Sequence, residues 1–109
     1  MDIKIIFNEK ENEAQAFDDD KKIGFLQYEE EENIWKATHT VVDKAYGGKG
    51  IAGKLLDEFV KNAKANDKKI LPICSYVEKK FDEDDKYKEM SISEFAIYSI
   101  MRFRISKFL

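Results

Sequence analysis

Two side chains in the sequence have the chemistry for nucleophilic catalysis: the single cysteine, Cys74, and the single histidine, His39. A cysteine thiolate is a strong nucleophile, and an imidazole can remove a proton near neutral pH. Both residues also fit ordinary structural roles, since a lone cysteine often packs as a small apolar side chain and a histidine can sit in a core. These two residues therefore indicate acyl-group chemistry only if the fold brings them to one site.

A cluster of glycines is the second chemical signal. Four of the five glycines fall within seven residues, in the stretch Gly47-Gly48-Lys49-Gly50-Ile51-Ala52-Gly53. The pattern predicts a turn leading into a helix, and the first N–H groups of a helix have no partner within it. No Ser, Thr or Asp stands at the expected N-cap, and glycine lets a ligand approach the backbone closely. A helix start of this kind favours an anion such as phosphate, with Lys49 and Lys54 adding positive charge.

Alternatives to a phosphate site at the glycine cluster are weaker or less specific. A glycine turn can serve the fold alone, without any ligand. The stretch lacks the Gly-Lys-Ser/Thr of a P-loop. Gly48, Gly50 and Gly53 do fit the spacing of a dinucleotide-binding fingerprint, but that fingerprint opens a parallel βαβ unit. The strands expected before this turn are antiparallel, which argues against a dinucleotide site.

The elements that would position these residues follow from the hydrophobic pattern. Alternating and β-branched residues predict strands at residues 3–8, 14–17, 23–28 and 34–42, joined by polar turns into an antiparallel meander. Apolar residues at helical spacing predict a helix over residues 50–66. A short apolar strand at residues 70–74 follows, and a strand–helix–strand order implies a parallel pair. A short helix at residues 76–81 and a charged loop complete an α+β domain over residues 1–90.

This order of elements suggests how Cys74 and His39 meet. On a regular strand His39 would share a face with Trp35, Ala37 and Val41. Cys74 would end the neighbouring parallel strand. A contact between the two side chains is therefore expected, with His39 as a general base.

The composition and net charge of the sequence exclude several classes of function. The net charge is −3 with both signs interspersed, which is unlike the basic footprint of a nucleic-acid-binding protein. No stretch reaches the length of a transmembrane helix, and one Cys with one His makes no zinc site. One cysteine also forms no internal disulfide, so we expect a reducing, cytoplasmic setting. A domain this short is marginally stable, and a cofactor or a second subunit in a homodimer would stabilise it.

The last segment, residues 91–109, differs from the rest. It holds both arginines of the chain and carries one acid against three bases. Ser91 and Glu94 have the spacing of a capping box, and the apolar residues that follow predict a helix. Four roles are open for this tail: packing on the domain, pairing between subunits, lying on a membrane, or being a foreign extension.

Three motifs together resemble a known family. His39–Val42 (HTVV), Gly47–Gly53 (GGKGIAG) and Pro72–Val77 (PICSYV) are similar in order and spacing to a subfamily of short proteins in the GNAT superfamily of N-acetyltransferases. The resemblance covers roughly residues 3–88. Gly50 and Ala52 match the last two positions of the superfamily pattern Gln/Arg-x-x-Gly-x-Gly/Ala. Gly47 stands where Gln or Arg is usual, a departure that the short subfamily shares.

The resemblance implies a reduced GNAT-like fold that binds acetyl-coenzyme A and transfers its acetyl group to an amine of a small molecule or protein. The fourth and fifth strands would splay apart to admit the cofactor, and Pro72, which lacks an N–H, suits that place. Cys74 would accept the acetyl group or act as a weak acid, and Tyr76 would protonate the coenzyme A thiolate. The implied cofactor-binding residues are Thr40, Val41, Val42, Gly47, Gly48, Lys49, Gly50, Ile51, Ala52, Gly53, Lys54 and Ser75.

Two alternatives stay open at this point. One is a GNAT-like module that binds coenzyme A or an acyl form without turnover. The other is a hydrolase that uses Cys74 and His39 and needs no cofactor. A phosphate site at the glycine turn would favour the first two functions over the hydrolase.

Overall fold

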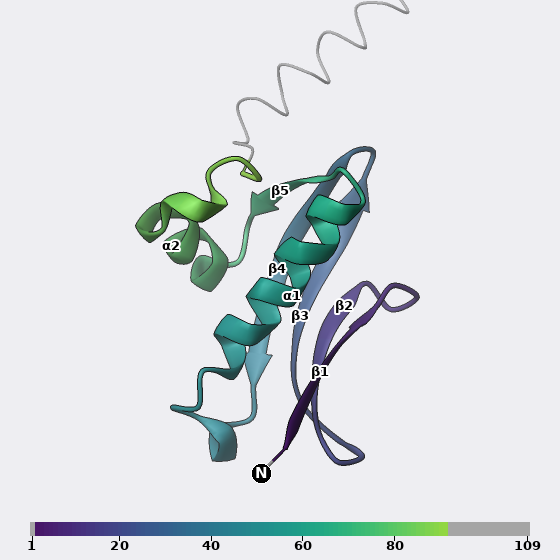
Figure 1. Ribbon diagram of the computed structural model, residues 1–109, viewed down its shortest axis with the longest axis vertical. Helices are drawn as coiled ribbons and strands as arrows, with labels where there is room; N and C mark the ends of the chain where they lie inside the picture. The colour runs from purple at the N-terminus through teal and green to yellow at the C-terminus, as the bar shows by residue number, and fades with distance from the viewer. Residues whose placement is uncertain (1, 92–109) are drawn as a thin grey trace, which may run out of the picture.

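A single mixed sheet forms the centre of the fold (Figure 1). The computed structural model describes residues 2–91. Neighbouring strands in the sheet follow the order of the chain, and the first four pair antiparallel while the fifth runs parallel to the fourth. The strands are β1 (Ile3–Asn8), β2 (Glu13–Asp18), β3 (Lys21–Glu31), β4 (Ile34–Val42) and β5 (Lys69–Pro72).

Within residues 2–91, two helices and two short 3₁₀ turns connect and follow the strands. The helices are α1 (Ile51–Ala65) and α2 (Ser75–Glu83), and the 3₁₀ turns are η1 (Lys44–Tyr46) and η2 (Asp85–Tyr87). Figure 1 shows α1 running along one face of the sheet and α2 lying beside the end of β5. The predicted meander, crossover helix and parallel strand are therefore confirmed.

The boundaries differ from the prediction in two informative places. β3 continues to Glu31 through acidic residues that were expected to form the hairpin connection, because an exposed hairpin end tolerates charged side chains. The predicted strand 70–74 ends at Pro72, and Cys74 is instead the N-cap of α2. Proline has no N–H to continue a ladder, so the strand stops there.

The buried side of α1 accounts for the close packing of helix and sheet. Its fully buried side chains recur at helical spacing and face the sheet: Ile51, Leu55, Leu56, Phe59 and Ala63. Phe59 completes an aromatic cluster in which Tyr28 and Trp35 lie 4.5 Å apart between ring centres, with Phe59 at 5.3 Å and 5.8 Å from them. Phe7 stacks on the same Tyr28 and Trp35 rings. Aromatic packing of this kind adds to the hydrophobic gain of burial.

The opposite face of the sheet holds a polar network. Glu13 and Gln15 are buried there, although both are polar. The Gln15 amide donates to Glu13 at 2.8 Å and to Glu11 at 2.9 Å, and the Lys22 ammonium pairs with Glu13 at 2.5 Å. Buried polar groups are tolerated when they are hydrogen-bonded in this way.

A bulge in β4 overturns the predicted position of His39. Tyr28 pairs with Ala37, but Gln27 pairs with His39, so Thr38 is an extra residue in β4. The Thr38 hydroxyl donates to the Gln27 carbonyl at 3.1 Å and fixes the bulge. An extra residue reverses the alternation of side chains. Trp35 and Ala37 are therefore buried on the α1 face, whereas His39 is exposed on the other face beside Val41.

The predicted C-terminal helix lies outside the described residues, as does Glu94 of the expected capping box. Ser91 itself forms a parallel bridge with Ile70 of β5. Within residues 2–91, none of the helices has the length and apolar character needed to cross a membrane.

The aromatic cluster predicts a large effect of Phe59→Ala, because this ring is fully buried between sheet and helix. We expect a loss of about 3–5 kcal/mol in the free energy of unfolding, measured by urea denaturation. Phe25→Ala is the matched control, since Phe25 is only partly buried on the opposite face. Equal losses for the two variants would contradict the assignment of the core to the α1 face.

Candidate active site

The site begins where β4 and β5 stop pairing. The ladder joins Ile34–Ala37 to Lys69–Pro72, and β4 then continues to Val42 without β5 beside it. The Ala37 carbonyl accepts hydrogen bonds from the N–H groups of Ile73 (3.1 Å) and Cys74 (2.8 Å). The Ile73 N–H also lies 3.1 Å from the Leu71 carbonyl, a tight turn centred on Pro72. This turn directs the chain away from β4 and leaves a gap along its edge.

The edge of β4 offers backbone groups to this gap. The Asp43 N–H donates to the Ile23 carbonyl at 2.7 Å, which fixes the phase of the alternating hydrogen bonds between β3 and β4. Val41, opposite Phe25, therefore directs its backbone groups toward β3. Thr40 and Val42 direct theirs away from β3, toward the gap. Of the predicted stretch Thr40–Val42, these two residues have the orientation needed to bind a ligand through the backbone.

Cys74 lies at the edge of the gap. It is the N-cap of α2, with extended backbone angles, and its sulfur lies 3.5 Å from the Thr40 hydroxyl oxygen. Burial raises the pKa of the Cys74 thiol, but hydrogen bonds from the Thr40 hydroxyl and from the backbone N–H groups of Val77, Tyr76 and Thr40 outweigh it, so the net pKa is lowered. A lowered thiol pKa increases the fraction of reactive thiolate at neutral pH.

Tyr76 connects α2 to the start of α1. Its hydroxyl lies 3.9 Å from the position that a Cβ on Gly53 would occupy, so the hydroxyl reaches the first turn of α1. Burial raises the pKa of the Tyr76 phenol, and the negative charges of Asp57 and Cys74 raise it further. The phenol therefore stays protonated at neutral pH and is available as a proton donor.

The glycine turn forms the other end of the site. Gly48 and Gly50 have φ values of 76° and 72°, which L residues rarely adopt, and a Cβ on either one would meet nothing within 4 Å. Gly50 is the N-cap of α1 and makes no side-chain capping hydrogen bond. The first hydrogen bond into the helix comes from the Lys54 N–H to the Gly50 carbonyl at 3.2 Å. The N–H groups of Ile51, Ala52 and Gly53 precede it and are suited to an anion.

The remaining residues predicted for cofactor binding lie around this turn or at α2. Gly47, Lys49 and Lys54 are exposed, so the two ammonium groups can move toward bound phosphates. The Ile51 side chain is buried under the sheet, which leaves only its backbone for a ligand. Ser75 is exposed as the first residue of α2. The open space over Gly48 and Gly50 and the uncapped helix start fit a pyrophosphate.

Sequence reasoning missed the residues that hold the glycine turn in place. The Tyr46 hydroxyl donates to Asp18 at 2.5 Å and ties η1 to the β2–β3 hairpin. The Asp43 carboxylate accepts from the Ala45 N–H at 2.9 Å and caps η1. A separate residue that sequence reasoning missed is Gly24, the fifth glycine. It leaves little room for a Cβ, which would lie 3.0 Å from the Val41 carbonyl oxygen. The signal for Gly24 was present in its place inside a predicted strand, where glycine often marks a close approach.

His39 does not join Cys74. Because Thr40 directs its hydroxyl to the sulfur, the preceding residue, His39, faces the opposite side of the strand. The imidazole expected to pair with Cys74 as a general base is thus replaced in the structure by the Thr40 hydroxyl.

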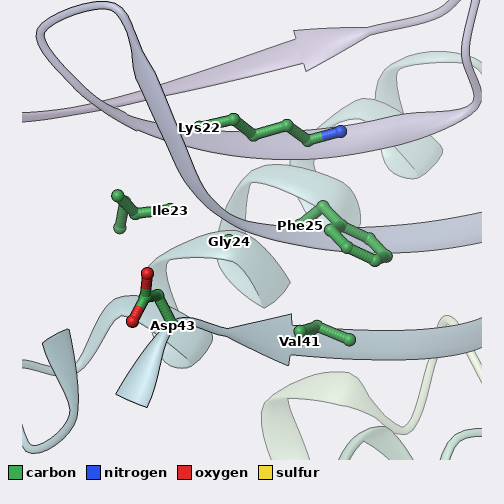
Figure 2. A pocket seen from close by; sticks show the side chains of 6 residues that line it. All are labelled: Lys22, Ile23, Gly24, Phe25, Val41 and Asp43. Carbon is green, nitrogen blue, oxygen red and sulfur yellow. The ribbon is translucent and has the colours of Figure 1, made fainter. Parts of the chain in front are cut away.

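A separate hollow lies on the face of the sheet opposite α1 (Figure 2). Its volume is about 270 Å³, and its lining residues are Lys22, Ile23, Gly24, Phe25, Val41 and Asp43. Figure 2 shows Phe25 and Val41 side by side on neighbouring strands. The Lys22 ammonium sits 5.0 Å from the centre of the Phe25 ring while paired with Glu13. Val41 is the one residue shared between this hollow and the predicted cofactor-binding set.

Across residues 2–91, no group of three or more His, Cys, Asp or Glu side chains is arranged to hold a metal ion.

Comparison with known proteins agrees with the fold. The sequence model of a family described as GCN5-related N-acetyl-transferase matches residues 13–90. The fold is similar to a solution NMR structure from Staphylococcus aureus of a GCN5-like protein described as a candidate N-acetyltransferase, with 27% identity and a TM-score of 0.67. That match covers 83% of this chain and 88% of the other. No curated protein matches the sequence significantly. The predicted reduced GNAT-like α+β fold is confirmed.

The backbone of the glycine turn predicts opposite effects for two similar substitutions. Gly50→Ala forces an L residue into the left-handed region and should destabilise the protein by roughly 1 kcal/mol. Gly53→Ala places its methyl group at ordinary contact distance from Tyr76 inside a helix, and should stabilise by roughly 0.5 kcal/mol. Thermal unfolding of the free protein measures both. A stabilising Gly50→Ala would contradict the left-handed N-cap.

Proposed function

Because the chain belongs to the GCN5-related N-acetyltransferase family, we propose that it transfers an acetyl group from acetyl-coenzyme A to an amine. Acetyl transfer is the chemistry of the family. The observation that most supports this proposal is the position of the Cys74 sulfur, at a helix N-terminus and beside the edge of β4. The uncapped start of α1 forms the other end of the same site.

The cofactor would be held mainly by backbone. The N–H groups of residues 51–53, with Gly48 and Gly50 giving access, bind the pyrophosphate, and Lys49 and Lys54 add charge from the surface. The Thr40 carbonyl and the backbone groups of Val42, which face the gap, bind the pantetheine arm, as a strand binds an added strand. Gly47 brings no side chain to this site, so the backbone has to supply what a Gln or Arg would add.

Bound acetyl-coenzyme A supplies an activated thioester. The Cys74 thiolate attacks its carbonyl carbon, a new carbon–sulfur bond forms to Cys74, and the bond to the coenzyme A sulfur breaks. Tyr76 gives its phenolic proton to the departing thiolate. An amine then attacks the acetyl-cysteine, the carbon–sulfur bond to Cys74 breaks, and the proton lost by the amine returns to Tyr76. The Cys74 thiolate is restored at the end of the cycle.

The acceptor is an amine of a small molecule or protein, and it meets a small, open site. A second copy of the chain would complete such a site, and we retain a homodimer as part of the proposal. The mechanism needs Cys74 as a free thiol, which suits the reducing conditions of the cytoplasm.

The hydrolase alternative loses its basis because His39 and Cys74 lie on opposite sides of β4. A Cys–His hydrolase requires the imidazole within hydrogen-bond reach of the sulfur. The alternative of a module that binds coenzyme A without turnover is separated from the enzyme by experiment.

Incubation with acetyl-coenzyme A should leave one acetyl group on Cys74, detected by mass spectrometry of the peptide that contains it. Cys74→Ser removes the thiolate and should abolish this adduct, while His39→Ala should retain it because His39 is remote from the sulfur. Thermal stabilisation by acetyl-coenzyme A beyond that given by free adenine nucleotides measures binding in the same samples. Stabilisation without any adduct or amide product would favour the non-catalytic module.

Removing the proton donor predicts a separate effect. Tyr76→Phe keeps the partly buried ring, which packs against the core, but removes the hydroxyl. We expect kcat to fall by roughly 10²-fold, the lower range for general acid catalysis, with little change in acetyl-coenzyme A affinity. Steady-state turnover with a panel of amines measures the rates. An unchanged kcat would exclude Tyr76 as the proton donor.

A further inference from the structure

The Cys74 sulfur is held by two different elements of the fold. One is the N-terminus of α2, where Cys74 is the N-cap and the backbone N–H groups of Val77 and Tyr76 help to lower the pKa of its thiol. The other is Thr40 on β4, which contributes both its hydroxyl and its backbone N–H. A helix start alone is a common feature, but the Thr40 hydroxyl, 3.5 Å from the sulfur and on a separate strand, fixes the sulfur at one point across the gap.

The bulge in β4 is what directs Thr40 to this place. Without the extra residue Thr38, the alternation that buries Trp35 and Ala37 would put His39 on the α1 face and Thr40 on the other. With the bulge, Thr40 shares the α1 face and reaches Cys74. The Thr38 hydroxyl bond to the Gln27 carbonyl holds this arrangement. Bulges next to functional sites commonly redirect a side chain in this manner.

The Thr40 hydroxyl suits both protonation states of the sulfur. When Cys74 is a thiol, its S–H donates to the hydroxyl oxygen at 3.5 Å. When Cys74 is a thiolate, the hydroxyl can rotate and donate its own proton to the sulfur. The second bond is charge-assisted and therefore stronger than the first. The hydroxyl thus favours the thiolate over the thiol.

Other titratable groups around the sulfur do not replace this contribution. On α2, the Tyr76 phenol interacts electrostatically with Cys74. Glu78 in the first turn of α2 and Lys80, near the Tyr76 ring, lie farther along the helix. From α1, Asp57 acts on Tyr76 and carries a negative charge that disfavours a thiolate. From β4, His39 faces away from the sulfur. The donors are therefore the hydroxyl and the backbone N–H groups.

We propose that Thr40 is a positioning residue that holds the Cys74 sulfur as a thiolate at the edge of the gap between β4 and β5. This inference adds a positioning residue to the proposed acetyl transfer, and only its role in that reaction rests on the proposed function. The Thr40 hydroxyl sets the fraction of thiolate at neutral pH and the position of the Cys74 sulfur. The Thr40 backbone N–H contributes to the same sulfur independently of the side chain.

The test is the rate at which iodoacetamide alkylates Cys74 in the whole free chain, measured as a function of pH. Thr40→Val keeps the branched shape and the backbone N–H but removes the hydroxyl, and Thr40→Ser keeps the hydroxyl. We expect the midpoint for Thr40→Val to move to higher pH, with a rate at neutral pH lower by roughly three- to tenfold. Thr40→Ser should follow the unchanged protein.

A Thr40→Val profile that superimposes on the unchanged protein would overturn the proposal, as would an equal shift in Thr40→Ser. Thermal unfolding checks that each variant is folded, and Thr40→Ala takes the place of Thr40→Val if the valine variant does not fold. Alkylation uses no acetyl-coenzyme A, so this result is independent of the proposed function. If the shift occurs but no acetyl adduct forms on Cys74, Thr40 keeps its role and the transfer mechanism fails.

Discussion

The site depends on one carbonyl group. The Ala37 carbonyl accepts the N–H groups of both Ile73 and Cys74, immediately after Pro72 has ended the ladder between β4 and β5. A regular parallel strand would have continued along β4 and covered its edge. Instead the chain turns into α2, β5 does not pair with β4 from Thr40 to Val42, and Cys74 becomes an N-cap beside this edge. The gap, the free backbone and the position of the sulfur all follow from this turn.

The aromatic core keeps both sides of the gap in place. Trp35 pairs with Ile70 in the short parallel ladder, and its ring packs against Tyr28 and Phe59. The Trp35 indole N–H donates to Glu30 at 3.0 Å, and Glu30 pairs with Lys68 just before β5. Burial of the aromatic rings contributes most of the stability here, because the ion pair is partly exposed and worth little. β4 therefore stays fixed to α1 and β5 at one end while its other end is open to a ligand.

Local patterns in the sequence were sufficient for the elements and the glycine turn. The alternation in β1, the β-branched and aromatic residues of β4, the helical spacing in α1 and the absence of a capping side chain at Gly50 depend on nearby residues, and the structure has each element in its expected place. In β4, which side chains lie on which face of the sheet depends on how the strand pairs with β3. Thr38 is ordinary in sequence, and only its hydrogen bond to Gln27 on β3 makes it a bulge. For the same reason the sequence suggested His39 as the partner of Cys74 and did not suggest Thr40 in that role. The prediction that Cys74 ends a strand was wrong. Pro72 ends the ladder with β4, and the two residues after it, Ile73 and Cys74, belong to the turn that leads into α2.

The central claim is that backbone amides at two places, the start of α1 and the free edge of β4, bind the same cofactor. Amide chemical shifts in ¹⁵N-labelled protein during titration with coenzyme A test this directly. We predict the largest shifts at Gly48, at residues 50–53 and at Thr40 and Val42, with Phe25 and the rest of the opposite face little changed. Shifts confined to the hollow around Phe25 and Asp43, or no shifts at the start of α1, would contradict it.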